Sequence, residues 1–478
     1  MKYVIVGSGP TGLSLAYNLA LNDKEIILIE QDSQLGGSWN SQYIDNKYWS
    51  ENSPRILVFA TNTLKLLKHV GLKDNNFKNV YGSYLETTYK KLSFTFKYFS
   101  LFDLIIILLL VIKYTLITCN ITLDVWLKDS GLSIKGRKAL RILSILMCDK
   151  PENTNINDFS FSLLLYGLFI PRQMTEPNKW HNLIEDYLKT KKNITILKNT
   201  KVIKLIENKN SIKSVYIKDL LNNNYKTIDC DKIILCTQSN NLYPLLKSGS
   251  YNLKNNWMNQ NKMKLWSENT YYSGFGFQLH FDKVVKYKNE FCWSCQDDWT
   301  VIILPVSKWL KKFSKDPLVK TVWSCCIVDM ETKSKNINKT ANECELQEVI
   351  DECLHQINKA YKIPKPYKIT TARGLKKENN KWLSKNTGYT KKNYEDLEMK
   401  GRIDNLYALG CFTKNNRSII AHMGTAIEAT VNYLNNYEKK LKVNIFRKSL
   451  FESIFFKGLL LLIVIKLLSI FITSSSMS

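Results

Sequence analysis

The chain has 478 residues, 45% of them hydrophobic and 12% aromatic, which excludes a disordered chain and suits roughly two or three interlocked domains. Its formal net charge is +26, but the basic residues are spread out and form no RNA-binding motif, so no nucleic-acid partner is expected. The eleven cysteines have no regular spacing, and no signal peptide is recognisable, which indicates a reduced protein facing the cytosol. Cys292 and Cys295 form a C-x-x-C pair, which we interpret as buried thiols rather than as a metal or redox site.

A glycine-rich turn follows the first predicted strand. Residues 2–6 are a short apolar run, and GSGPTG comes directly after it, with Gly7, Gly9 and Gly12 in G-x-G-x-x-G spacing. A helix is predicted next, and then a second buried strand that ends at Glu30. The glycines permit a tight turn and the approach of a pyrophosphate, and Glu30 can accept hydrogen bonds from ribose hydroxyls. This order predicts a dinucleotide site whose turn also includes Ser8, Pro10 and Thr11.

Paired glycines, Gly36 and Gly37, follow the second strand in the segment ILIEQDSQLGGSW. This segment resembles the flavin fingerprint of the FAD-dependent amine-oxidase superfamily, which includes monoamine oxidases, phytoene-type desaturases and protoporphyrinogen oxidases. The resemblance implies an α/β protein in which a Rossmann-type FAD-binding domain is interleaved with an α+β substrate domain. That family has Arg after the paired glycines, where this chain has Ser38 and then Trp39. The GG-x-W pattern is also similar to flavin monooxygenases, and that alternative stays open.

The segment 50–72 resembles the stretch of protoporphyrinogen oxidases that reads Gly-Pro-Arg before a helix. The resemblance implies that Pro54 and Arg55 lie beside the flavin ring; the alternative is an ordinary loop and amphipathic helix.

Residues 201–219 predict a hairpin that turns at Asn208–Asn210, and residues 233–236 predict a buried parallel strand. This order resembles the family's middle FAD segment, in which the backbone at Val202 would touch the adenine.

The segment 405–434 resembles the family's closing flavin motif. It predicts a buried strand that ends in Gly410 and, after a loop, a helix that opens at Gly424. The resemblance implies that this helix points its positive N-terminus at the flavin pyrimidine. Cys411 stands where the family has an acidic residue. The remaining expected cofactor contacts are Met423 and Thr425, and His422 lies either at the ring edge or in loop packing.

Residues 241–400 carry predicted strands at 274–281, 300–306 and 321–330, which suggest the mixed sheet that covers the flavin in this family. No second G-x-G-x-x-G occurs for a nicotinamide cofactor, which favours an oxidase or dehydrogenase over a monooxygenase. The sequence identifies no catalytic base; the candidates are Arg55, His280 and His422.

Two apolar segments predict contact with a membrane. Residues 98–119 are too short for a confident span; they are expected to insert from one side, and the alternative is a buried helix. Residues 454–473 are long enough to cross a bilayer as a tail anchor, interrupted by Lys457 and Lys466. Basic residues precede that tail and would keep the folded domain on the cytosolic side. The competing interpretation is an amphipathic helix on the membrane surface.

The chain is predicted to divide into six regions. They are a first FAD-binding segment (1–82), a helical substrate- or membrane-associated region (83–190), a second FAD-binding segment (191–240), the substrate-domain sheet (241–400), a third FAD-binding segment (401–440) and the membrane anchor (450–474). The resemblance implies an oxidation in which the flavin takes a hydride from an apolar or amine substrate, with FAD as cofactor and no metal. A flavin monooxygenase, or a membrane protein that keeps the flavin fold without catalysis, are the alternatives.

Overall fold

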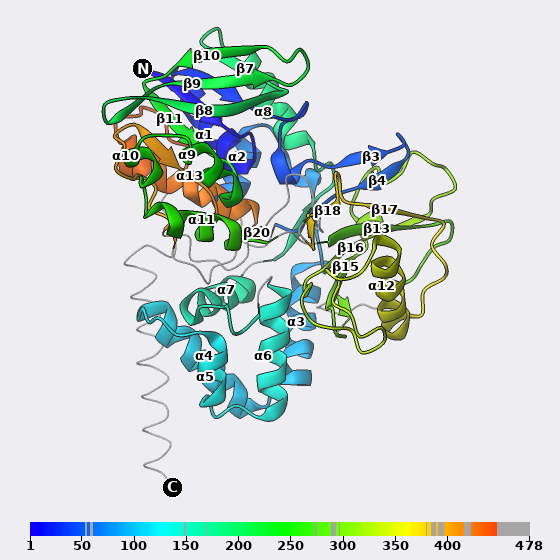
Figure 1. Cartoon of the computed structure of the whole chain (residues 1–478). Helices are drawn as coiled ribbons and strands as arrows, with labels where there is room; N and C mark the ends of the chain where they lie inside the picture. The colour runs from blue at the N-terminus through cyan, green and yellow to red at the C-terminus, as the bar shows by residue number, and fades with distance from the viewer. Residues whose placement is uncertain are drawn as a thin grey trace.

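The computed structural model describes residues 1–52, 55–57, 61–147, 150–168, 170–272, 275–287, 293–295, 297–378, 380–383, 389–390, 396–414 and 422–446. Three regions are visible in Figure 1. The N-terminal sheet and its helices lie at the top, a second sheet lies to the right, and a group of helices lies below both. Cys292, Pro54 and the predicted tail at 454–473 are outside the described residues.

A five-stranded parallel sheet forms the first region, in the order β21-β11-β1-β2-β7. Its strands are β1 (Lys2–Val6), β2 (Glu25–Ile29), β7 (Ile194–Leu197), β11 (Lys232–Leu235) and β21 (Leu406–Ala408). Both faces are covered, because Tyr3 and Ile5 belong to one buried cluster while Val4 and Val6 belong to another. The prediction of an α/β parallel sheet is confirmed.

Helices cover one face of this sheet. They are α1 (Pro10–Ala20), α2 (Thr61–His69), α8 (Lys179–Lys189) and α13 (Met423–Tyr437). Buried hydroxyl groups join α1 to α13, because Thr11 Oγ1 donates to the Ala426 carbonyl at 3.0 Å and Ser14 Oγ lies 2.8 Å from Thr430 Oγ1. The start of the chain and the last described helix therefore pack as one layer.

An antiparallel hairpin covers the other face. The strands β8 (Thr200–Asn208) and β9 (Ser211–Asp219) pair with each other, and β10 (Tyr225–Asp229) extends them into a three-stranded sheet. The turn at Lys209 has a positive φ of 54°. Val202, Leu205 and Val215 pack against the parallel sheet. The predicted hairpin is confirmed.

The second region contains a five-stranded sheet in the order β14-β15-β16-β13-β17. Its strands are β13 (Phe275–Phe281), β14 (Ser294–Cys295), β15 (Val301–Leu304), β16 (Thr321–Ile327) and β17 (Lys368–Thr371), and α12 (Leu346–Tyr361) packs on one face. Every described pairing in it is antiparallel, so the expectation of a mixed sheet is wrong. The strands β14, β15 and β16 follow one another along the chain and pair as a meander, whose direct connections favour antiparallel pairing.

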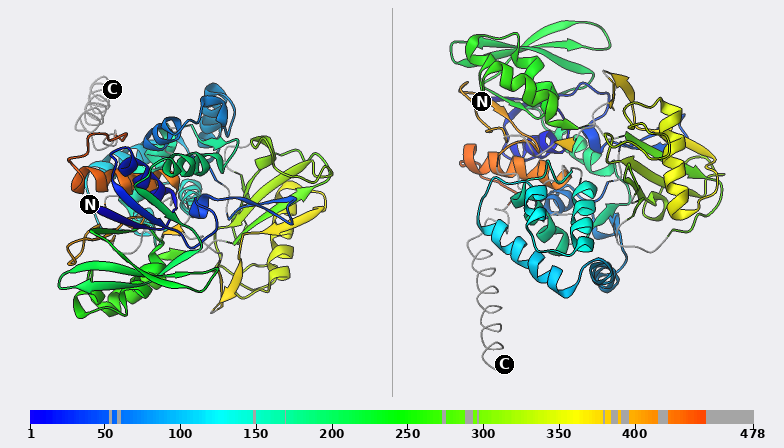
Figure 2. Two further views of the ribbon diagram at one scale, coloured as in Figure 1. Left: turned by 90° about the horizontal axis from the view of Figure 1, so that it is seen from above. Right: turned by 60° about the horizontal axis from the view of Figure 1, so that its bottom comes forward.

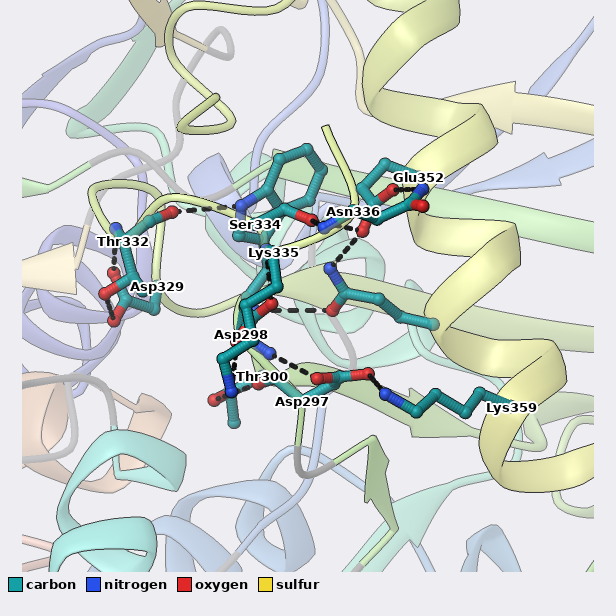
Figure 3. A network of polar contacts seen from close by, with 12 residues as sticks. Asp297, Asp298, Thr300, Asp329, Thr332, Ser334, Lys335, Asn336, Glu352 and Lys359 are labelled. Atoms are coloured by element: carbon teal, nitrogen blue, oxygen red, sulfur yellow. Dashed lines mark hydrogen bonds and ion pairs between the residues drawn. The ribbon is translucent and has the colours of Figure 1, made fainter. Parts of the chain in front are cut away.

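A polar network ties the loops of this sheet to α12 (Figure 3). The buried carboxylate of Glu352 accepts hydrogen bonds from Ser334 Oγ at 2.6 Å, Asn336 Nδ2 at 2.7 Å and Gln356 Nε2 at 2.9 Å. At the edge of the same network, Lys359 Nζ donates to Asp297 at 2.8 Å. These bonds fix the loop after β16 against the helix.

The third region is a helical bundle. It comprises α3 (Tyr84–Tyr98), α4 (Leu101–Leu116), α5 (Leu123–Lys128), α6 (Ile134–Leu146) and α7 (Ile156–Leu168), with a buried cluster of their own apolar side chains. Figure 2 shows these helices gathered beneath the parallel sheet. Asp103 joins two helix N-termini, since its carboxylate accepts from the amide and hydroxyl of both Ser100 and Ser133.

The helix α4 falls within the segment 98–119, and its residues Leu110, Val111 and Ile112 are buried. Leu101, Phe102, Leu108 and Leu109 on the same helix are exposed. No single helix in the described residues has the length and apolarity to cross a membrane; α3 and α4 together do, with a bend of 112° between them.

The remaining elements connect these regions. They are β3 (Gln42–Ile44), β4 (Tyr48–Ser50), β5 (Phe77–Asn79), β6 (Arg172–Met174), α9 (Leu242–Leu246), α10 (Tyr251–Lys254), α11 (Gln260–Asn269), β12 (Tyr271–Tyr272), β18 (Lys376–Glu378), β19 (Lys381–Leu383) and β20 (Tyr389–Thr390). The segment after β4 crosses to the second sheet, where Gln278 Nε2 donates to the Glu51 carbonyl at 2.7 Å.

Candidate functional site

A cavity of about 410 Å³ opens at the carboxyl edge of the parallel sheet. The turns that follow β1, β2, β11 and β21 all line it, which is where open α/β sheets bind ligands. The lining residues are Val6, Gly7, Ser8, Gly9, Pro10, Thr11, Ile29, Glu30, Gln31, Gly37, Ser38, Trp39, Thr200, Lys201, Val202, Ile203, Cys236, Thr237, Gln238, Asn241, Pro244, Leu245, Leu409, Gly410, Cys411, Phe412, His422 and Ala426.

The three glycines of the first turn have distinct surroundings. Gly7 has φ +99°, and a Cβ on it would lie 2.7 Å from the Cys236 carbonyl oxygen. A Cβ on Gly12, which lies behind the cavity wall, would lie 1.9 Å from the Gly7 oxygen. A Cβ on Gly9 would meet nothing within 4 Å, because Gly9 faces the cavity. The backbone at Gly9 is therefore accessible to a ligand.

The N-terminus of α1 is free of side-chain capping. Gly9 is its N-cap residue and makes no capping hydrogen bond, and Pro10 occupies the first turn. The amides of this turn thus keep their partial positive charge for an anion in the cavity. This open cradle fits the pyrophosphate of a dinucleotide.

Glu30 lies in the cavity wall at the end of β2. Its carboxylate accepts hydrogen bonds from Ser8 N at 2.8 Å, Ser8 Oγ at 2.6 Å and Asp32 N at 3.0 Å. Burial raises the pKa of Glu30, and these hydrogen bonds counteract that effect. The side chain is held in one orientation, with acceptor capacity left for the hydroxyls of a ribose.

Paired glycines let the next loop pass close to the turn. Gly36 and Gly37 have φ of +105° and +55°, and a Cβ on Gly37 would lie 2.9 Å from the Gly9 Cα. Gly36 does not line the cavity; a Cβ there would lie 2.7 Å from His181 Cδ2. Ser38 and Trp39, which follow, do line the cavity. Two residues that bear side chains could not adopt this path without strain.

Arg55 does not line the cavity but supports its wall. The guanidinium donates through Nη2 to the carbonyls of Ser38 at 2.6 Å and Asn40 at 2.8 Å, and it lies 6.0 Å from the centre of the Trp39 ring. Its side chain is buried beside Glu51. Burial raises the pKa of Glu51, and the positive charge of Arg55 offsets only part of that increase. Arg55 is expected from the sequence beside the flavin ring; its support of the 38–40 loop depends on tertiary contacts and has no signal in the sequence.

The far end of the cavity is formed by the hairpin and by α9. Thr200, Lys201 and Val202 approach from β8, and Pro244 and Leu245 from α9. A register shift between Val202 and Lys204 interrupts the pairing of β8 with β9 at this point. Backbone groups and an apolar surface here suit the edge and face of an adenine. The contact of Val202 with adenine stays a prediction.

The opposite end lies between β21 and α13. Gly410 and Cys411 line the cavity, whereas Met423, Gly424 and Thr425 do not. The amides of Gly424 and Thr425 donate instead to Nδ1 of His422, at 2.9 and 3.4 Å. The imidazole of His422 therefore caps the helix and itself lines the cavity, and the orientation of the α13 N-terminus toward the flavin pyrimidine stays a prediction.

The other candidates lie away from the cavity. His280 is fully buried in β13, 5.5 Å from the Tyr48 ring, and burial lowers its pKa to about 4. Cys295 is buried in β14, and burial raises the pKa of its thiol to about 12. Neither lines the cavity.

Two residues that line the cavity, Thr237 and Gln238, were not predicted. Their position directly after a predicted parallel strand was a usable signal.

Comparisons with known proteins support the same fold. Residues 5–70 match the family of NAD(P)-binding Rossmann-like domains. A search of curated protein sequences finds no match. The structure of an oxidoreductase from Methanosarcina mazei is similar with a TM-score of 0.63 and 14% identity, covering 91% of this chain and 100% of that chain.

Two amine oxidases are also similar. Putrescine oxidase bound to putrescine gives a TM-score of 0.58 at 10% identity, over 92% of this chain and 100% of that chain. Cyclohexylamine oxidase from Brevibacterium oxydans gives 0.54 at 11% identity, over 92% and 99%. The chain has the amine-oxidase fold. The resemblance seen in the glycine-rich segments is thus confirmed at the level of the fold, and residues that line the cavity come from all three segments of the resemblance.

Proposed function

We propose that this protein is an FAD-dependent oxidoreductase of the amine-oxidase type, which takes a hydride from an apolar or amine substrate at a membrane. The observation that carries the proposal is the continuity of one cavity from the uncapped N-terminus of α1 to the N-terminus of α13. Its lining offers a pyrophosphate cradle and an apolar recess, as an elongated dinucleotide requires.

Each portion of the cavity has a defined task in this proposal. The amides at Gly9 and Thr11 hold phosphates, Glu30 holds a ribose, and the loop at Ser38–Trp39 closes over the ligand with support from Arg55. FAD, when bound, supplies the hydride acceptor. We assign the substrate region to the side of the second sheet, whose strands β13 and β16 are buried and would exclude water from it.

Reduction of the bound flavin tests the proposal. The full-length chain is purified in detergent with added FAD, freed of excess cofactor, and mixed without oxygen with putrescine, cyclohexylamine or a long-chain amine. We expect a yellow protein that releases FAD on denaturation and that is bleached by at least one of these amines or by an apolar hydride donor.

Other outcomes overturn the proposal in different ways. A colourless protein would refute FAD binding. Bleaching by NADPH alone would indicate a monooxygenase. A yellow protein that none of the substrates bleaches would indicate a flavin-binding protein without catalysis, an alternative that the departures at Ser38 and Cys411 favour.

The location at a membrane belongs to the same proposal. It is supported by the apolar composition of residues 454–473, by the basic residues before them and by the exposed apolar residues of α4. We propose a C-terminal tail anchor with the folded domain on the cytosolic side.

Carbonate extraction of cell membranes tests this location. We expect the full chain in the membrane pellet and a chain that ends at Phe446 in the supernatant. If the shortened chain also stays in the pellet, the tail is not the main anchor, and the α3–α4 face becomes the candidate. Recovery of the full chain in the supernatant would overturn membrane attachment.

A further inference from the structure

His422 occupies a position that histidine rarely takes, the N-cap of a long helix. Its backbone is extended, with φ −116° and ψ 175°, and its ring turns back over the first turn of α13. Nδ1 accepts the amide hydrogen of Gly424 at 2.9 Å and lies 3.4 Å from the amide of Thr425. The residue is 7% exposed and lines the cavity.

These contacts fix the tautomer of the ring. Backbone amides are donors only, so Nδ1 must be the acceptor and must lack a hydrogen. The single hydrogen of the neutral imidazole is therefore on Nε2. Among the residues that the structure describes, none accepts a hydrogen bond from Nε2.

Three effects keep this ring neutral. Protonation of Nδ1 would break both amide contacts, and it would place a positive charge at the positive end of the α13 dipole. No acidic side chain is present in the first turn of α13, which is described in full, to offset that charge. Burial lowers the pKa of His422 to about 4.

The same contacts make Nε2–H a stronger donor. Hydrogen bonds to Nδ1 from the helix N-terminus withdraw electron density from the ring, and the bonds in such a chain polarise one another. The electrostatic effect of α13 thus reaches the cavity through the imidazole rather than through bare amides.

We propose that His422 is a fixed-tautomer hydrogen-bond donor, which presents Nε2–H to an acceptor atom of the ligand at the α13 end of the cavity. This inference rests on the proposed function, in which that ligand portion is the flavin ring. Donation at this point favours negative charge on the reduced ring. His422 is accordingly a binding residue that tunes the cofactor, and it is excluded as a catalytic base because its Nδ1 already accepts two amides.

Nitrogen-15 NMR of the full-length chain in detergent tests the tautomer without requiring bound flavin. The chain has five histidines, and the resonances missing from a His422→Asn variant assign the ring. We expect an unprotonated Nδ1, a protonated Nε2 and a neutral ring from pH 7.5 to pH 5.5. A hydrogen on Nδ1, or an imidazolium at pH 7, would overturn the inference.

The reduction potential of the bound flavin tests the donation. His422→Asn retains an N-cap acceptor, but its shorter side chain leaves the position of the Nε2 hydrogen empty. We expect the equilibrium constant for reducing the bound flavin to fall about tenfold, the value of one hydrogen bond to a developing charge. The control is His69→Asn, a histidine on α2 that is exposed and bonds to Tyr17, and this change should leave the potential unaltered.

The two failures are distinguishable. If the wild-type chain binds no flavin, the proposed function fails while the NMR experiment still decides the tautomer. If flavin binds and His422→Asn leaves its potential unchanged, the donor role fails and the proposed function stands.

Discussion

Gly9 and Gly12 lie three positions apart in the sequence, yet a methyl group added at Gly9 would have open space and one added at Gly12 would clash with the backbone. At Gly9 it has open space and φ is −67°, which alanine adopts freely, whereas at Gly12 it would lie 1.9 Å from a backbone oxygen. We expect Gly9→Ala to keep the melting temperature of the flavin-free protein but to lower its flavin content, because the methyl group fills the cradle. Gly12→Ala should lower the free energy of unfolding by about 1–3 kcal/mol.

The measurements are thermal unfolding and the ratio of flavin to protein absorbance. Equal flavin content in Gly9→Ala and in the wild type would contradict the assignment of this turn as the phosphate cradle. An unchanged melting temperature in Gly12→Ala would contradict the close packing of α1 on the turn.

Three buried histidines predict sensitivity to acid. Burial lowers the pKa of His181, His280 and His422 to about 4, whereas in the unfolded chain each has its usual value near 6.5. Above pH 6.5 both states are unprotonated, so these groups cause no pH dependence. Between pH 6.5 and pH 4 only the unfolded chain takes up protons, so stability falls as the pH falls.

Urea unfolding at pH 7 and at pH 5 measures this effect. Each histidine should contribute about 2 kcal/mol of destabilisation at pH 5 relative to pH 7. A variant that lacks one of them, such as His280→Asn, should show a smaller pH dependence by about that amount, whatever its stability at pH 7. Equal pH dependence in the two proteins would be the contrary result.

At the scale of elements, Asp103 connects two helices. Burial opposes its ionisation, but hydrogen bonds from Ser100 and Ser133 prevail and lower its pKa to about 2. Asp103→Ala removes these bonds from the N-termini of α4 and α6 and should lower the free energy of unfolding by about 2–4 kcal/mol. Faster hydrogen exchange at the first turns of both helices would show that the loss is local. The control is Asp129→Ala, an exposed residue at the end of α5.

The network of Figure 3 gives a second prediction at this scale. Glu352→Gln places an amide group among donors that need an acceptor, with Ser334 and Asn336 on either side. We expect a loss of about 2–3 kcal/mol in the free energy of unfolding, measured by thermal denaturation. Lys359→Met, which removes only an exposed ion pair with Asp297, should have no measurable effect. An equal loss of unfolding free energy in both variants would contradict the expectation that the buried hydrogen bonds of Glu352 contribute more stability than the exposed ion pair of Lys359.

The sequence predicted those elements whose signal is local. Residues 3–6 and 233–236 are unbroken apolar runs, and the glycines at 7, 9 and 12 specify the turn between strand and helix. It did not predict contacts that depend on tertiary structure. The role of Asp103 could not be predicted because its partner Ser133 is distant in sequence, and the capping role of His422 could not because histidine is not a typical N-cap residue.

At the scale of the whole molecule, three separate stretches of chain form one sheet and one cavity. β1 pairs with β2 and β11, and β11 pairs in turn with β21. The described walls of the cavity come from residues within 6–39 and 200–245, from 409–412, and from 422 and 426. The intervening stretches form the helical bundle and the second sheet, so both are insertions into the dinucleotide domain.

This arrangement has a consequence for synthesis in the cell. A nascent chain that has only its first forty residues outside the ribosome holds the glycine turn but lacks β11 and β21, the strands that flank it on one side. Loading of any nucleotide must therefore wait until translation is almost complete. A chain that is interrupted before residue 406 lacks β21, so the edge of β11 stays open and no bound ligand protects the chain from proteases.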